Sequence, residues 1–115
     1  MATHIEQYDC AIEVEREGKI EEAIERLKAI VEKNPEYALA YSALSVFCQK
    51  QGRLDAAVEH ARKVTELEPE DPFSFTALSL VCQKAGLLSE AEEAMAKAHK
   101  AAFDIQRKAR EAQEE

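Results

Sequence analysis

The chain has 115 residues, of which 46% are hydrophobic and 33% are charged, and its formal net charge is −8 at pH 7. A chain of this size and composition forms one small domain with a modest core. Its few glycines, prolines and aromatic residues argue against a β-sandwich, while its many Ala, Glu, Leu and Lys residues favour helices. No segment has an excess of basic residues, which disfavours nucleic acid as a partner.

The N-terminal sequence MATHIEQYDC has no apolar stretch of signal-peptide length. No run elsewhere approaches the roughly 18 apolar residues that a membrane span requires. We therefore expect a cytoplasmic protein without a membrane span. Three cysteines, Cys10, Cys48 and Cys82, are odd in number and far apart, which predicts buried, reduced thiols rather than disulfides.

Apolar periodicity predicts six amphipathic helices in chain order, over residues 4–17, 20–33, 38–51, 55–68, 72–85 and from 89 onward. Three of their N-termini carry capping signals. The sequences Thr3-x-x-Glu6 and Ser89-x-x-Glu92 are typical of capping boxes, and Asp71 precedes a proline at the first helical position. Residues 90–115 contain neither proline nor glycine, so the last helix is predicted to be long.

The helices repeat with a period of 34 residues. The stretch ALSVFCQK at residues 43–50 returns as ALSLVCQK at residues 77–84, and Gly18, Gly52 and Gly86 keep the same spacing. The chain is therefore three copies of one helix pair, with a glycine in the turn. A pair this short cannot bury its own apolar face, so each copy is predicted to be covered by its neighbour.

This pattern resembles the tetratricopeptide repeat over residues 4 to about 102. The second repeat fits the signature at Tyr41, Leu44, Ser45, Cys48, Ala57, Ala61 and Pro69, and the third at Phe75, Leu78, Ser79, Cys82, Ala91 and Met95. The first repeat fits more loosely, with Gln7, Cys10, Ala11 and Val14 at the corresponding positions.

The resemblance implies an all-α, right-handed superhelix, or α-solenoid, of three helix-turn-helix units. The predicted domain is residues 1–102, with repeats at about 4–37, 38–71 and 72–102, followed by a C-terminal helical extension at 103–115. Ser45 and Ser79 lie where the family usually has glycine, so we expect them at the closest approach of each helix pair, facing Ala57 and Ala91.

The first helix of each repeat carries a second apolar stripe, about 200° from the stripe that packs within its unit. Because one core cannot cover both stripes, the second is predicted to remain at the surface. In the family these positions line the concave groove, where a peptide segment binds. The predicted partner-binding residues are Ile5, Tyr8, Ile12, Leu39, Val46, Gln49, Lys50, Phe73, Leu80, Gln83 and Lys84.

The resemblance also bears on the ligand. One mode of the family holds a ligand's C-terminal carboxylate with Lys, Asn and Arg side chains, but the matching residues here are Tyr8, Ile12, Ala43, Phe73 and Ala77. The expected ligand is therefore an amphipathic helix or an apolar peptide rather than a chaperone tail. Lys50 and Lys84 have an alternative explanation, because a cation also complements the C-terminal end of a helix.

Two other functions remain open. The groove or the C-terminal helix could join two copies of the chain, or the cysteines could serve thiol-linked or metal-linked regulation. The alanine-rich extension could fold back as a capping helix, pair with a second copy, or fray. No catalytic constellation, metal motif or cofactor-binding loop is present in the sequence, so we expect a protein-interaction scaffold that is not an enzyme and carries no cofactor.

Overall fold

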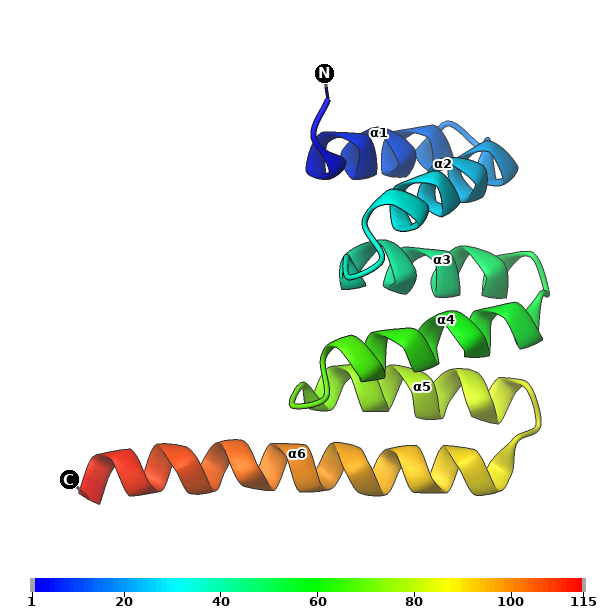
Figure 1. The fold of residues 1–115 in the computed structure, drawn as a ribbon. Helices are drawn as coiled ribbons and strands as arrows, with labels where there is room; N and C mark the ends of the chain where they lie inside the picture. The colour runs from blue at the N-terminus through cyan, green and yellow to red at the C-terminus, as the bar shows by residue number, and fades with distance from the viewer. Residues whose placement is uncertain (1, 115) are drawn as a thin grey trace.

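The computed structural model describes residues 2–114, which form six α-helices stacked in chain order (Figure 1). Each helix packs against the next one in the sequence, and the predicted all-α solenoid of helix pairs is confirmed. The predicted bounds agree with the observed ones to within one residue. The helices are α1 (His4–Arg16), α2 (Ile20–Lys33), α3 (Ala38–Lys50), α4 (Leu54–Leu67), α5 (Pro72–Lys84) and α6 (Leu88–Glu114).

Two of the three predicted N-terminal caps are confirmed. The Thr3 side chain accepts a hydrogen bond from the Glu6 N–H at 3.1 Å, and the Asp71 carboxylate accepts one from the Phe73 N–H at 3.0 Å. The prediction for Ser89 is wrong, because α6 begins one residue earlier, at Leu88. Ser89 therefore lies inside the first turn of the helix, where its side chain is no longer at the capping position.

The turn inside each repeat is built on a glycine with a left-handed backbone, with φ between +74° and +90°. In the second repeat, the Gly52 N–H donates to the Gln49 carbonyl and the Arg53 N–H donates to the Cys48 carbonyl, at 3.0 and 2.9 Å. This pair of bonds is the Schellman motif, which satisfies carbonyls that the end of a helix leaves free. The glycine thus ends α3 and lets α4 run back against it.

Serine hydroxyls join the two helices of the second and third repeats. Ser45 Oγ donates to the Ala57 carbonyl at 2.9 Å, and Ser79 Oγ donates to the Ala91 carbonyl at 2.7 Å. All four residues are buried. The predicted close approach is therefore confirmed, and each buried hydroxyl has an acceptor on the facing helix.

Neighbouring repeats share the core. Ile24 and Val58, on the second helices of the first two repeats, are almost completely buried, as are Phe47 and Val81 on the helices that follow them. The position equivalent to Ile24 and Val58 in the last repeat is Glu92, which is exposed. These residues confirm the predicted stacking, in which each repeat is covered by the next.

The prediction of buried cysteines holds for Cys48 and Cys82 but is wrong for Cys10, which is exposed. In the second repeat the equivalent residue, Leu44, is buried in a cluster with residues of α2. No described helix covers α1 on the corresponding side, so Cys10 faces solvent. Burial raises the pKa of the Cys48 and Cys82 thiols, which keeps both protonated and unreactive at neutral pH.

Helix α6 is continuous and is the longest of the described helices. By the repeat spacing, the point at which α2 and α4 end corresponds to Ala101, yet α6 continues to Glu114. Residues 102–114, which we call the overhang, project beyond the stack (Figure 1). The overhang does not fold back, so that alternative is wrong: nothing in its sequence breaks the helix.

Candidate functional site

An exposed apolar stripe runs across the first helices of the three repeats. Its members are 46% to 80% exposed, although each is large and hydrophobic. The opposite sides of α1, α3 and α5 lie in the core, so a second face of each helix remains uncovered. The stripe, which we call the groove stripe, consists of Ile5 on α1, Leu39 and Val46 on α3, and Phe73 and Leu80 on α5.

The middle of the groove stripe borders a pocket between α3 and α5. The pocket has a volume of about 200 Å³, and its lining includes Val46 and Gln49 of α3, Val64 of α4, and Phe73 and Ala77 of α5. Its exposed surface is mainly apolar, and its polar lining residues are Ser42, Ser45, Gln49, Asp71 and Ser74. This shape suits an apolar side chain that enters from the groove.

The first repeat contributes less open surface to the groove. Tyr8 and Ile12 are partly buried and pack against the core cluster of the first two repeats. The Tyr8 ring meets the Tyr37 ring edge to face, with 5.9 Å between the centroids. Burial is the main cause of the raised pKa of Tyr8. This tyrosine therefore remains neutral at physiological pH, and its ring helps to support the start of α3.

Polar contacts between adjacent repeats follow one edge of the groove. Lys50 Nζ lies 3.2 Å from Glu15 Oε1, and Lys84 Nζ donates to Gln49 Oε1 at 3.0 Å. Both contacts join residues 35 positions apart, so the second repeats the first one unit later. From the sequence, these lysines are assigned to the end of a helix or to a ligand, and their contacts with the preceding repeat are missed. The sequence feature that indicates such contacts is the recurrence of a polar pair at a spacing of 35 residues.

The structure thus places the predicted residues in three groups. The groove stripe is exposed, Tyr8 and Ile12 are half-buried, and Gln49, Lys50 and Lys84 form the contacts between repeats. Gln83 is exposed at the end of the same edge. Whether these residues bind a partner stays a prediction.

Two further observations concern residues 2–114. Within this range no group of three or more His, Cys, Asp or Glu side chains is placed to hold a metal ion. None of the described helices combines the length and the apolar character needed to cross a bilayer.

Stacked helix pairs with an exposed apolar stripe on their first helices define an α-helical repeat protein. The family model for the tetratricopeptide repeat matches residues 16–79, more than half of the sequence. The chain belongs to the tetratricopeptide repeat family.

Solved structures of other proteins share this fold. A crystal structure of MamA superimposes with a TM-score of 0.82 at 22% sequence identity, and the match covers 91% of this chain and 61% of that one. The second tetratricopeptide repeat domain of Spaghetti (RPAP3), bound to the HSP90 peptide SRMEEVD, gives 0.75 at 19% identity, covering 85% of this chain and 91% of that chain.

A third similar structure is the Yersinia enterocolitica type III secretion translocator chaperone SycD, with a TM-score of 0.75 at 20% identity. That match covers 86% of this chain and 75% of that chain. The present chain spans less than two thirds of the MamA chains it matches. No curated protein sequence matches it. At these identities, the likeness to solved structures establishes the fold alone.

Proposed function

We propose that this chain is a non-catalytic protein-interaction module that binds an amphipathic helix or an apolar peptide segment in the groove of α1, α3 and α5. The observation that carries the proposal is the groove stripe, a run of large hydrophobic side chains exposed on all three helices. Soluble proteins rarely leave contiguous apolar surface uncovered unless it binds something.

The chemistry of the groove favours an apolar ligand over a carboxylate. Fully burying a Leu, Val or Phe side chain contributes about 1.5–3 kcal/mol, so contacts with Leu39, Val46 and Phe73 favour an apolar ligand, against the free-energy cost of association. The structure of the RPAP3 domain contains a peptide that ends in EEVD. The residues here at the family's carboxylate-holding positions, including Ala43 and Ala77, carry no cation, so the proposed ligand differs from that peptide.

Relatives support a role in protein binding. The RPAP3 domain is bound to an HSP90 peptide, the SycD protein is a translocator chaperone, and a further match is the CopN–Scc3 complex. These proteins present the same helical stack. The proposal transfers only this general property to the present chain.

The test uses the double variant Leu39→Glu, Leu80→Glu, which places two carboxylates in the groove. We expect it to lose partners captured by the wild-type chain, identified by pull-down and mass spectrometry, while its helical circular dichroism stays unchanged. The matched control is Leu88→Glu with Ala96→Glu, which adds the same charge at exposed sites on α6. Equal capture by both double variants would contradict the proposal.

Homo-oligomerisation is a second candidate, because Phe103 and Ile105 are exposed on the overhang of α6. In this alternative, the groove or the overhang contacts another copy of the chain. Light scattering at several protein concentrations separates the two functions. A mass that stays at 12.9 kDa across the series excludes the second candidate.

A further inference from the structure

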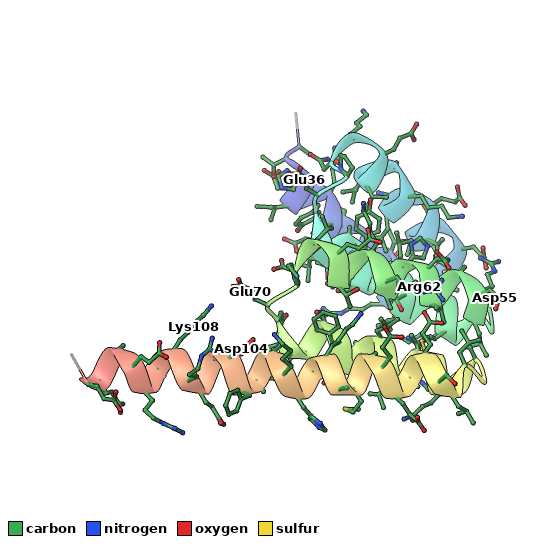
Figure 2. All side chains as sticks on the ribbon, turned by 60° about the horizontal axis from the view of Figure 1, so that its bottom comes forward. Glu36, Asp55, Arg62, Glu70, Asp104 and Lys108 are labelled. Carbon is green, nitrogen blue, oxygen red and sulfur yellow. The ribbon has the colours of Figure 1, made fainter. Side chains whose placement is uncertain are left out.

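The C-terminal end of the stack contains an elbow between α6 and the turn that joins α4 to α5. Helix α4 ends at Leu67 and α5 begins at Pro72, whereas α6 continues past both to Glu114. The turn therefore lies at the same end of the stack as the overhang. Figure 2 shows Glu70 on the turn, with Asp104 and Lys108 projecting from α6 toward that side.

A pocket of about 220 Å³ occupies this elbow. Its lining combines apolar surface with charged groups at the rim, and it shares no residue with the pocket of the groove. We call it the elbow pocket. Its apolar part consists of Pro69 on the turn, Phe75 on α5, and Ala101 and Ile105 on α6.

The apolar part of the elbow pocket continues an interface inside the molecule. Ala91, Ala94, Ala98 and Ala101 recur every three or four residues on α6 and are buried, so they share the face that packs on α5. Ile105 is the next residue of this series and is 50% exposed. The face remains apolar at this point, but α5 begins only at Pro72 and does not extend along the overhang, so its cover stops before the apolar surface does.

The rim of the elbow pocket carries three lysines and two carboxylates, in a chain whose net charge is −8. Lys97 is paired with Glu93 at 3.4 Å, and Lys100 with Asp104 at 3.3 Å. Of the rim residues, Lys108 and the Glu70 carboxylate form no ion pair with any described residue. One turn from Ile105, Lys108 therefore offers a free ammonium group beside exposed apolar surface.

We propose that the elbow pocket binds a segment of a partner protein that places an apolar side chain between Phe75 and Ile105 and an adjacent carboxylate on Lys108. The segment lies along α6 at the position that α5 would occupy if it were extended at its N-terminus, before Pro72. Lysines outnumber carboxylates by three to two around the pocket, so charge complementarity favours an acidic segment, and the apolar wall supplies burial. This surface is separate from the groove and goes beyond the function proposed above.

Three fluorescein-labelled peptides, EELFEE, KKLFKK and EEGSEE, test the proposal by fluorescence polarisation with the full chain. We expect saturable binding of EELFEE and much weaker binding of the other two, because one lacks the carboxylates and the other lacks the apolar side chains. Ile105→Glu and Lys108→Glu should each weaken binding of EELFEE by about tenfold or more. Both residues are exposed, so these variants keep the fold.

Two controls separate this surface from the groove. Arg110→Glu makes the same charge reversal on the overhang outside the pocket, and Leu39→Glu with Leu80→Glu disables the groove. We expect EELFEE to bind both variants as it binds the wild type. Amide chemical shifts should move at Ala101 and Ile105 on addition of the peptide, and those of the groove stripe should not.

The proposal is overturned if none of the peptides binds, if KKLFKK binds as well as EELFEE, or if the shifts concentrate in the groove. It is also overturned if sedimentation shows a dimer that Ile105→Glu dissociates, because the occupant is then a second copy of the chain. Loss of binding in the groove variant alone would assign the peptide to the groove and leave the elbow without a ligand.

Discussion

Ser79 performs two tasks at the crossing of α5 and α6. It is small enough for the helices to approach closely, and its hydroxyl donates to the Ala91 carbonyl at 2.7 Å. A glycine would allow the approach but would supply no hydrogen bond across the pair. Ser45 does the same in the preceding repeat, so this residue choice belongs to the repeat unit rather than to one site.

Substitutions at Ser79 should separate these two tasks. We expect Ser79→Ala to lower the free energy of unfolding by about 1 kcal/mol through loss of the hydrogen bond. Ser79→Leu should lower it by about 2–4 kcal/mol, because overpacking adds to that loss. Urea unfolding followed by circular dichroism measures both. Ser89→Ala, at an exposed site on α6, is the control, and equal effects of the Ala and Leu changes at Ser79 would contradict the steric argument.

His60 is expected to make the stability of the fold depend on pH. It lies on α4 near Tyr41, with 6.3 Å between the ring centroids. Burial lowers the pKa of His60, the Lys28 ammonium lowers it further, and Glu59 partly opposes the shift. Because the unfolded chain binds a proton more readily, below about pH 6.5, stability should fall as the pH drops through this value and level off below the folded-state pKa.

The contribution of His60 can be isolated by comparing the unfolding free energies at pH 7.5 and pH 5.5. We expect His60→Gln to reduce the difference between the two values relative to the wild type. His99→Gln removes an exposed histidine and should leave the difference unchanged. If both variants behave alike, the pH dependence does not originate at His60.

At the residue scale, the sequence predicts the contacts that recur in each repeat. It misses the contacts and the burial that depend on how neighbouring helices are arranged in space. The serine contacts follow from recurrence, because equivalent residues in a repeat occupy equivalent places. The sequence shows the recurring 35-residue spacing of Glu15 with Lys50 and of Gln49 with Lys84, but whether these side chains touch depends on the angle between adjacent repeats. The prediction for Cys10 is wrong because the equivalent residue of the second repeat, Leu44, is buried by the helix of the preceding repeat, and no described helix takes that place beside α1.

The glycine turns determine where the first helix of each repeat ends. At Gly52 the backbone is left-handed, with φ of +74°, and a Cβ atom would meet no other atom within 4 Å. Any cost of replacing this glycine therefore comes from the backbone itself. The same reasoning explains why the helix bounds could be predicted so closely: glycine, proline and the capping residues mark nearly every end.

Replacement of Gly52 by alanine should test this explanation. We expect Gly52→Ala to lower the free energy of unfolding by about 1–2 kcal/mol, the usual cost of a left-handed L-residue, as measured by urea unfolding. Gly52→Asn should cost less, because asparagine tolerates this conformation better. An equal loss in both variants would indicate that the space around the turn, rather than the backbone, is limiting.

Helix α6 shows the limit of prediction at the scale of elements. Its length could be predicted, because residues 90–115 contain neither glycine nor proline. Its path relative to its neighbours could not, because the turn between α4 and α5 lies next to the overhang only after the stack has formed. The elbow pocket is therefore a feature that the sequence gives no sign of.

At the scale of the whole molecule, the 34-residue period predicts the stack and the exposed side of its first helices. It does not predict how exposed each predicted groove residue is. Phe73 is more exposed than Leu39 or Val46, whereas Tyr8 and Ile12 in the first repeat pack against the core. These differences arise from local packing, so the open part of the groove stripe lies mainly on α3 and α5.

The order of packing has a consequence for how the protein is made. Every helix packs against the one that follows it in the chain, so the contacts close short loops, which are fast to form. A nascent chain can dock each helix as it leaves the ribosome, without waiting for the C-terminus. Synthesis and folding can therefore proceed at the same pace, because only the core-facing side of the newest helix waits for the next helix to cover it.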